Sequence, residues 1–259
     1  MKTKLLLLLM CLVSLSVMGQ VPVTRQSTRR ETPQKQNQPV KPKTTPTKPA
    51  QPRQTTPSSR PAVQSKPASG TINGHEWVDL GLSVKWATCN VGASSPSDYG
   101  GYFAWGETST KSSYDWSNCF DCLDSTGDSW GTYKLGGQTR ITPTSGHDTA
   151  RENWGGTWRM PTDAENDELC KKCKWTWTSK NGHNGYTVTG PNGNSIFLPA
   201  AGFRRGASSY GVGEGGVYWS STLSSSYSDN ARYLYFDSSG HNTLNYYRRN
   251  GQSVRPVTE

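Results

Sequence analysis

The chain has 259 residues and a formal net charge of +9, and aromatic residues make up 10% of it. The basic charge is concentrated near the N-terminus. Residues 20–70 carry ten Lys and Arg against one Glu, whereas residues 71–259 carry sixteen basic and eighteen acidic side chains. A nucleic-acid-binding domain needs basic charge on its own surface, so no nucleic-acid partner is expected for residues 71–259.

The first nineteen residues have the pattern of a secretory signal peptide. Lys2 and Lys4 precede an apolar run over residues 5–17. This run is shorter than the roughly 20 residues that a membrane-spanning helix needs, so no transmembrane segment is expected. With cleavage after Gly19, residues 1–19 form the signal peptide. The protein is predicted to be secreted or to reside in the cell envelope, either in the periplasm or exposed on the surface.

Residues 20–70 are predicted to be a disordered linker. They contain ten of the sixteen prolines, many Thr, Gln and Ser, and almost no large apolar side chain. Such a segment buries too little apolar surface to offset the entropy lost on ordering. Its basic charge suits contact with an anionic envelope or a polyanionic glycan. The alternative is that the Lys and Arg side chains only keep the linker soluble.

Residues 71–259 have the length of one domain and hold all ten Trp and all five Phe of the chain. Eight or nine short strands are predicted among ten candidate runs, because aromatic and β-branched runs alternate with Ser, Asn and Gly turns. A hairpin is expected at the Pro191–Asn194 turn, since Asn-Gly between two such runs favours a tight turn. The candidate strands lie at 77–80, 84–88, 102–105, 175–177, 186–189, 195–198, 218–223, 231–236, 243–248 and 253–257.

Two helices are predicted between these strands. Residues 148–154 form the first, which ends at two consecutive glycines. Thr162 and Glu165 have the spacing of a capping box and predict a second helix over about 163–173. The sum is an α+β fold with mostly antiparallel pairing. The side chains expected on the buried face of the second helix are Leu169 and Cys173.

Six strings between residues 72 and 257 carry a family resemblance. They occur in this order: Trp77–Ala93 (WVDLGLSVKWATCNVGA), Gly101–Thr108 (GYFAWGET), Trp154–Thr162 (WGGTWRMPT), Phe197–Gly202 (FLPAAG), Gly215–Leu223 (GGVYWSSTL) and Gly251–Val257 (GQSVRPV). Together they resemble the secreted major-paralogous (FISUMP-type) domains abundant in Bacteroidetes. The resemblance implies a C-type-lectin-like fold, distantly shared with formylglycine-generating enzymes and with variable receptor-binding proteins. It also implies a secreted or envelope location, but no defined activity.

Two departures limit what the resemblance implies. Formylglycine-generating enzymes use a copper-binding cysteine pair late in the domain, whereas no cysteine follows Cys173 here, so that oxidase chemistry is not expected. Calcium-dependent lectins bind sugar through Glu-Pro-Asn or Gln-Pro-Asp and Trp-Asn-Asp motifs. Here Gly190 precedes Pro191-Asn192 and no Trp-Asn-Asp occurs, so the lectin motifs for calcium-dependent sugar binding are missing.

The cysteines allow three interpretations. Two Cys-x-x-Cys pairs have the spacing of a tetrathiolate zinc site, but exported thiols tend to oxidise, which favours disulfides. A bond from the first pair to the second would staple the long polar stretch over residues 106–147 to the second helix. Free thiols are the third interpretation, and the odd number leaves one thiol unpaired or paired between molecules. The five cysteines outside the signal peptide are Cys89, Cys119, Cys122, Cys170 and Cys173.

No cofactor is indicated, apart from a possible calcium ion. Asp121, Asp124 and Asp128 lie in a Gly- and Ser-rich stretch, and carboxylate oxygens on a loop suit calcium. Solvated carboxylates are the alternative.

No enzyme is predicted, because the four scattered histidines form no nucleophile motif. A hydrolase of unrecognised type remains an alternative, since the two carboxylates of a glycosidase are paired only in space. The candidate carboxylates are Glu107, Glu165 and Glu214.

Residues 224–249 are predicted to form a recognition surface. They are rich in Ser, Tyr, Asn, Asp, His and Arg. Tyrosine gives a large contact area at low entropy cost, while Ser and Asn adapt their hydrogen bonds. Leu234 and Phe236 are expected to be buried, so Tyr233 and Tyr235 on the opposite side of their strand are expected to be exposed. The candidate contact residues are Tyr227, Asp229, Asn230, Tyr233, Tyr235, His241, Asn242, Asn245, Tyr246 and Tyr247.

The tryptophans are a second possible contact surface, as a platform for stacking sugars. We expect most of them in the core instead, because few other large apolar side chains are available to fill it. They are Trp105, Trp154, Trp158, Trp175, Trp177 and Trp219.

The sequence therefore predicts an adhesion or recognition module at the cell surface, with a glycan or a protein as its ligand. The main alternative is a structural module of the envelope or extracellular matrix without a discrete ligand. The composition of residues 224–247 also suggests a diversified region like those of variable receptor-binding proteins.

Overall fold

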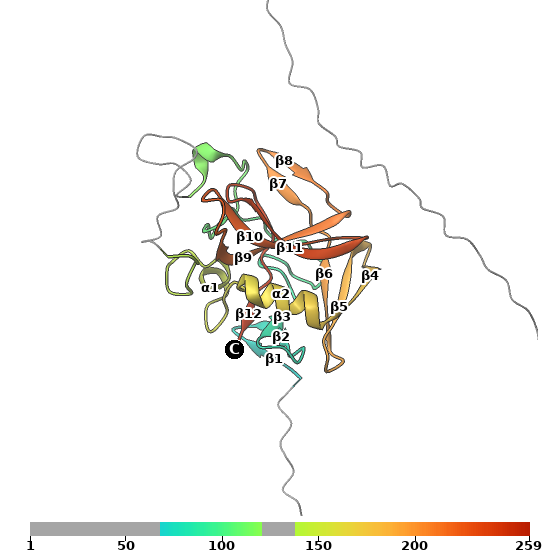
Figure 1. The fold of residues 1–259 in the computed structure, drawn as a ribbon. Coiled ribbons are helices and arrows are strands. Elements are labelled where there is room, and N and C mark those ends of the chain that lie inside the picture. The colour runs from blue at the N-terminus through green and yellow to red at the C-terminus, as the bar shows by residue number, and fades with distance from the viewer. Residues whose placement is uncertain (1–67, 121–137) are drawn as a thin grey trace, which may run out of the picture. The chain divides into compact units, whose positions relative to one another are not determined.

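The computed structural model describes residues 68–120 and 138–259, and Figure 1 shows its ribbon. These ranges form two α-helices, one short 3-10 helix and twelve strands. The elements are β1 (Ser69–Ile72), β2 (His75–Val78), β3 (Lys85–Ala87), η1 (Trp116–Asn118), α1 (Thr149–Trp154), α2 (Asp163–Lys172), β4 (Lys174–Lys180), β5 (His183–Thr189), β6 (Ser195–Pro199), β7 (Phe203–Arg205), β8 (Ser208–Tyr210), β9 (Gly215–Leu223), β10 (Asn230–Asp237), β11 (Gly240–Tyr247) and β12 (Val257–Thr258).

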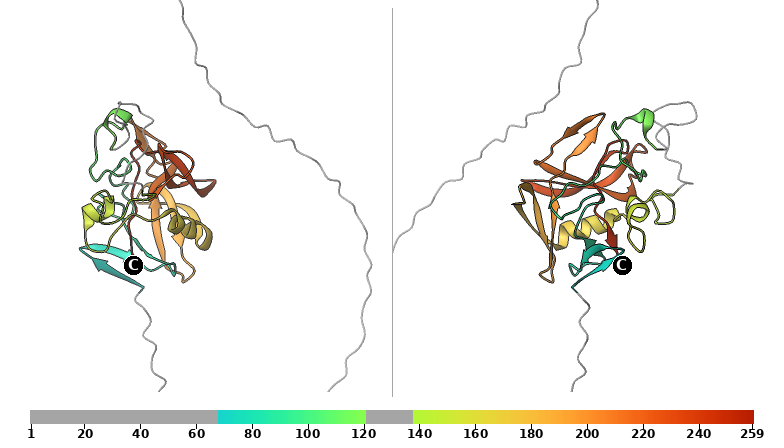
Figure 2. Two further views of the ribbon diagram at one scale, coloured as in Figure 1. Left: turned by 60° about the vertical axis from the view of Figure 1, so that its left-hand side comes forward. Right: turned by 180° about the vertical axis from the view of Figure 1, so that it is seen from behind.

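The strands form small sheets in which every strand pair is antiparallel, which confirms the predicted α+β class. One sheet has the order β1-β2-β3-β12 and joins the two ends of the described chain (Figure 1). Two three-stranded sheets, β11-β10-β9 and β4-β5-β6, and the β7-β8 hairpin complete the set. Figure 2 shows α2 packed beside these sheets from two further sides. No helix in the described ranges is long and apolar enough to cross a membrane.

Both predicted helices form, and their ends follow from local hydrogen bonds. The Asp148 side chain caps α1 by accepting from the Arg151 N–H, and Gly155 ends the helix at a φ of 65°. A residue with a Cβ is strained at such a positive φ, so glycine suits this position. In α2 the capping box is complete: Thr162 Oγ1 accepts from the Glu165 N–H at 3.3 Å, and the Glu165 carboxylate accepts from the Thr162 N–H at 2.8 Å.

Replacing Thr162 by alanine is expected to lower the free energy of unfolding by about 1 kcal/mol, because one backbone donor of the first turn loses its acceptor. Thr162→Ser keeps the hydroxyl and is the matched control, with an expected change within a few tenths of a kcal/mol. Urea denaturation of the two variants measures the difference. Equal midpoints for both variants would show that the capping box does not stabilise α2.

The sheet of β9, β10 and β11 lies between two hydrophobic clusters. Val217 and Trp219 of β9 belong to the first cluster, and Tyr218 between them belongs to the second. Alternate residues of a strand point to opposite faces, so both faces of this strand are covered. The sequence contains no signal for this two-sided burial beyond the near-absence of charge in β9.

This arrangement confirms one prediction about β10 and corrects another. Leu234 and Phe236 are buried in the second cluster as predicted. Tyr233 was expected to be exposed, but it is 8% exposed and packs in the first cluster against Trp219. The prediction was wrong because it assumed that one face of the strand meets solvent. Tyr235 is partly buried and packs against the same cluster.

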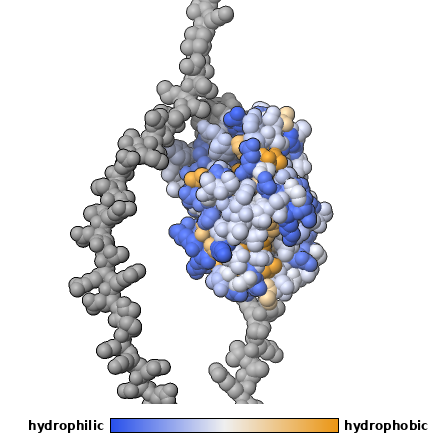
Figure 3. Space-filling view, turned by 90° about the vertical axis from the view of Figure 1, so that its right-hand side faces the viewer, coloured by the Kyte–Doolittle hydropathy of each residue, from blue (hydrophilic) through white to orange (hydrophobic). Residues whose placement is uncertain are grey.

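Most of these tryptophans lie in the core, as predicted. Trp105, Trp158 and Trp219 are fully buried, and Trp154 is 8% exposed. Trp175 and Trp177 are partly buried against the second cluster. Figure 3 shows the face near β4, β5 and β6, where apolar residues occur only in small separate patches on a hydrophilic surface. Single apolar side chains on a surface are ordinary and need no ligand to cover them.

Several strand boundaries differ from the predictions. The structure contains β1, β7 and β8, which the sequence pattern did not predict. β1 begins at Ser69, inside the range assigned to the linker. Its Gly70 lies opposite Trp77 of β2. Glycine suits this position because a Cβ at Gly70 would meet the Trp77 ring at 2.5 Å. The run 102–105 forms only one bridge, between Phe103 and Gln252.

Candidate ligand-binding surface

A surface hollow with a volume of about 650 Å³ and another of about 570 Å³ lie on the described part of the chain. The smaller one is formed by the loop between β9 and β10 together with the end of β11. It is formed by residues near the two ends of the stretch over residues 224–249 that the sequence predicted as a recognition surface. Its lining residues are Ser226, Tyr227, Ser228, Asp229, Asn230 and Tyr247. We call these residues, with Trp116 and Arg249, the tyrosine surface.

Local hydrogen bonds set the shape of this loop. Ser224 Oγ accepts from the backbone N–H groups of residues 226 and 227, and the Asn230 N–H donates to the Tyr227 carbonyl at 3.1 Å. The loop is joined to the end of β11 because the Arg248 N–H donates to the Asp229 carbonyl at 3.0 Å. These bonds hold the loop in a tight turn and leave the Tyr227 side chain 59% exposed.

Trp116 and Arg249 extend this surface, and neither was among the predicted contact residues. The Trp116 ring stands edge-on to the Tyr247 ring, with centroids 5.6 Å apart. The Arg249 guanidinium lies 4.9 Å from the Trp116 ring and 5.4 Å from the Tyr247 ring. A cation held against two aromatic rings is pre-organised for contact, because its orientation costs little further entropy. The polar neighbours of Trp116, Asp115 and Ser117, are the signal that sets it apart from the core tryptophans.

The ten predicted contact residues separate into groups. Tyr227, Asp229, Asn230 and Tyr247 meet at the hollow, although Asp229 is mostly buried. Tyr233 and Tyr246 pack together at the first cluster. The end of the β10–β11 pair that lies away from the hollow, called here the far end, holds Tyr235, His241 and Asn242. Asn245 accepts a hydrogen bond from Arg232 at 3.3 Å.

The far end of the β10–β11 pair serves packing. The His241 ring stacks on the Trp175 ring at 4.2 Å, and burial lowers the pKa of His241. The Tyr235 hydroxyl donates to the Asp237 carboxylate at 2.8 Å. Along a strand of this length the two ends are roughly 20 Å apart, so one small ligand cannot contact both groups.

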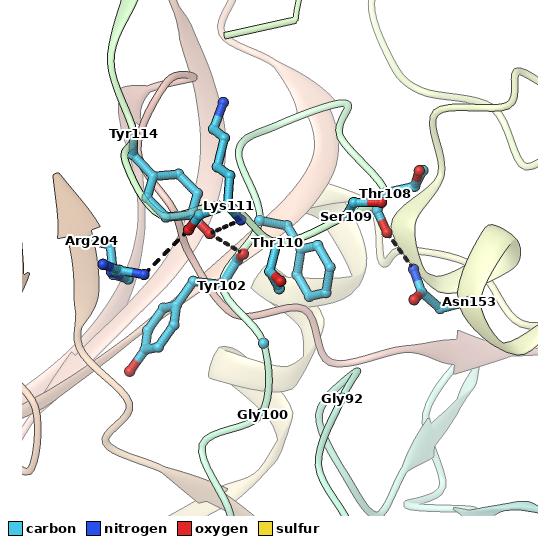
Figure 4. Close-up of a pocket in the computed structure, with 12 residues that line it drawn as sticks. Gly92, Gly100, Tyr102, Thr108, Ser109, Thr110, Lys111, Tyr114, Asn153 and Arg204 are labelled. Carbon is cyan, nitrogen blue, oxygen red and sulfur yellow. Dashed lines mark hydrogen bonds between the residues drawn. The ribbon is translucent and has the colours of Figure 1, made fainter. Parts of the chain in front are cut away.

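The larger hollow is a polar groove (Figure 4). It lies where β7, the end of α1 and the segments between residues 92 and 114 meet. We call it the polar groove, and its lining residues are Gly92, Gly100, Gly101, Tyr102, Phe103, Thr108, Ser109, Thr110, Lys111, Tyr114, Asn153 and Arg204. The sequence prediction placed no ligand here, although two of the strings that carry the family resemblance contribute to its walls.

The predicted disulfide staple is not formed. Cys89, Cys170 and Cys173 are free thiols, so no bond joins the second Cys-x-x-Cys pair to the first. The physical reason is their placement: Cys170 and Cys173 lie at the end of α2 against the second cluster. Cys119 instead follows η1, where its neighbour Phe120 packs against the first cluster. Cys122 lies outside the described residues.

Neither predicted metal site is assembled in the described ranges. These ranges contain no group of three or more His, Cys, Asp or Glu side chains that could hold a metal ion. One cysteine of the predicted zinc site, Cys122, lies outside those ranges. The predicted calcium ligands also lie outside them; they are Asp121, Asp124 and Asp128.

The thiols of α2 are expected to react slowly in the native protein. Burial raises the pKa of Cys170 to about 12 and that of Cys173 to about 11. At pH 8 the reactive thiolate fraction of Cys170 is then on the order of 10⁻⁴. Alkylation by iodoacetamide, followed by peptide mass mapping, should be at least tenfold slower at both positions than in urea. Equal rates in the two conditions would contradict the packing of these thiols.

The three candidate catalytic carboxylates lie in separate parts of the fold. Glu107 pairs with Lys111 at 2.8 Å, and Glu165 pairs with Arg159 at 2.6 Å. Glu214 is exposed in the turn before β9. The first two carboxylates therefore hold loops in place through ion pairs.

A comparison with protein families matches residues 167–257 to a model described as a domain of unknown function (DUF8237). The matched range runs from within α2 to β12 and includes the β9–β10 loop. No curated protein and no solved structure matches the chain.

Proposed function

We propose that the chain is a secreted or cell-surface recognition module that binds a glycan or protein ligand through the tyrosine surface. One observation carries this proposal. Tyr227 and Tyr247 are 59% and 36% exposed, and they frame a hollow beside a tryptophan and an arginine. Tyr, Trp and Arg dominate the energetics of binding surfaces, because each combines a large contact area with a hydrogen-bonding tip.

The rest of the chain supports the same proposal. A signal peptide would deliver the domain outside the cytoplasm, and a disordered linker over residues 20–70 would let it reach a ligand at some distance. The α+β fold with small antiparallel sheets is compatible with the C-type-lectin-like fold that the FISUMP-type resemblance implies. We therefore place the chain, as part of this proposal, among FISUMP-type surface proteins.

Alanine at both Tyr227 and Tyr247 is expected to weaken ligand binding at least a hundredfold. Each truncation removes a hot-spot contact, which costs about 2 kcal/mol or more at an interface, and about 1.4 kcal/mol is a tenfold change in Kd. The measurement is titration of the ligand found by array screening, with thermal denaturation as the folding check. Tyr210→Ala is the matched control, because Tyr210 is 39% exposed but lies on β8, outside the tyrosine surface. Wild-type ligand affinity in the Tyr227→Ala/Tyr247→Ala variant would contradict the proposal.

The alternative function is a structural envelope or matrix module, which the basic charge of residues 20–70 favours. Such a module should show no saturable ligand, and it should fractionate with envelope material through the linker. Deleting residues 20–70 then releases the protein into the soluble fraction. A binding module keeps its ligand affinity after the same deletion.

A further inference from the structure

Three glycines line the polar groove, and two of them, Gly100 and Gly101, are closely packed against their neighbours. Gly100 has a φ of 74°, and a Cβ on it would meet the Val91 carbonyl oxygen at 2.5 Å. A Cβ on Gly101 would meet the Phe103 ring at 2.8 Å and the Thr110 methyl group at 3.0 Å. Both positions are therefore closely packed and require glycine, and the main chain lines the groove there (Figure 4).

Arg204 gives the groove a cation that no carboxylate neutralises within the described residues. Its guanidinium donates to three backbone carbonyls, those of residues 111, 112 and 207, at 3.3, 3.1 and 2.9 Å. Its Nε is buried without a partner. The guanidinium also lies 5.4 Å from the Tyr114 ring, which fixes its plane. Three of the five N–H donors are used and the Nε–H is buried, so the positive charge and one Nη1–H remain to meet an anionic group.

The other cation of the groove is already paired. Lys111 Nζ lies 2.8 Å from the Glu107 carboxylate and donates to the Asn118 carbonyl at 2.7 Å. The groove lining contains no Asp or Glu. The uncompensated charge of the groove is therefore positive and belongs to Arg204.

The opposite wall supplies hydroxyl groups. The side-chain hydroxyls of Thr108, Ser109 and Thr110 make no hydrogen bond within the described residues, and Ser109 and Thr110 are exposed. Phe103 is the only side chain of the lining that has no polar atom. A peptide ligand needs apolar pockets for its side chains, whereas a sugar needs hydroxyl partners and a ring face. The lining therefore favours a saccharide over a peptide.

We propose that the polar groove is a second binding site, separate from the tyrosine surface, and that it takes an anionic saccharide whose carboxylate or sulfate group pairs with Arg204. The groove has about 650 Å³ of space, within the usual range for small-ligand sites. The hydroxyls of Thr108 and Ser109 bond the sugar hydroxyls.

The test introduces one charge into the groove without removing a buried bond. Thr110→Glu places a carboxylate at an exposed lining position, and Thr110→Gln is its matched neutral control. The probes are a galacturonate tetramer, its fully methyl-esterified form, a heparin hexasaccharide and tetraglutamate, titrated by calorimetry against the full chain. Binding of at least one acidic saccharide is expected. Its Kd should rise at least tenfold in T110E and stay within twofold in T110Q.

Further arms separate this proposal from the function proposed above. The Tyr227→Ala/Tyr247→Ala variant should bind the acidic saccharide with unchanged Kd, because its substitutions lie outside the groove. Arg204→Met should abolish binding of the acidic saccharide, and circular dichroism checks that this variant is folded. If it does not fold, the Kd of the T110E variant tests the inference by itself. Absence of binding to both acidic saccharides overturns the inference. So does equal binding of the methyl ester, equal or tighter binding of tetraglutamate, or an unchanged Kd in T110E.

Discussion

Replacing Arg255 by alanine is expected to destabilise the domain by more than about 4 kcal/mol, enough to leave most of the protein unfolded or insoluble. The Arg255 side chain is 1% exposed. Its guanidinium donates to the Asn90 side chain at 2.8 Å, to the carbonyls of Ala87 and Thr88 at 3.0 and 2.6 Å, and to that of Phe197 at 3.0 Å. Each hydrogen bond from a charged donor contributes about 1.5–3 kcal/mol.

The effect is large because one side chain satisfies acceptors in two segments that are distant in sequence, residues 87–90 and β6. Without Arg255, these oxygens are left buried and unpaired next to a cavity, and both penalties act on the junction between β3 and β6. Arg205→Ala is the matched control, since Arg205 is exposed on β7 and only stacks on Tyr210 at 5.2 Å. Urea denaturation or soluble yield measures the outcome. An R255A protein that unfolds at the wild-type midpoint would contradict this account of the C-terminal segment.

The second large effect is expected for Trp219. It is fully buried in the first cluster, and its Nε1 donates to the Phe103 carbonyl at 2.8 Å. Alanine at this position should cost about 3–5 kcal/mol, because it removes a large apolar side chain from a close-packed core. It also leaves the Phe103 carbonyl without that donor.

A second tryptophan supplies the contrast. Trp116 is partly exposed on the tyrosine surface, so Trp116→Ala should change the free energy of unfolding by less than about 1 kcal/mol while weakening ligand binding at least tenfold. Thermal denaturation and ligand titration of the two alanine variants separate the core role from the surface role. Equal loss of stability in both would show that Trp116 is a packing residue, which contradicts its place in the proposed site.

The helices were predictable because their signals are local. The Thr162–Glu165 box and the two glycines after Trp154 act within a few residues, and both helices end within one residue of the prediction. The β5–β6 hairpin follows from Asn192-Gly193 for the same reason. Strands β7 and β8 were missed, because Phe203–Arg205 and Ser208–Tyr210 have almost no apolar alternation.

The site was only half predictable, because its members are distant in sequence. Tyr227 and Tyr247 follow from composition, but Trp116 joins them through a contact over more than 100 residues. Tyr233 was misplaced, since the sequence pattern of β10 does not reveal that a second cluster covers its other face. The cysteine staple failed in the same way: Cys-x-x-Cys spacing says nothing about where two pairs lie relative to each other.

The central claim, that this is a recognition module, is tested most directly by one binding experiment. The purified chain, folded as judged by a cooperative thermal transition, is applied to a broad glycan and glycoprotein array, with and without EDTA. We predict saturable binding that the Tyr227→Ala/Tyr247→Ala variant loses for at least one class of ligand. Loss of signal in EDTA would add a calcium ion to that site. A blank array, together with no saturable partner in envelope fractions, would contradict the claim and favour a structural module.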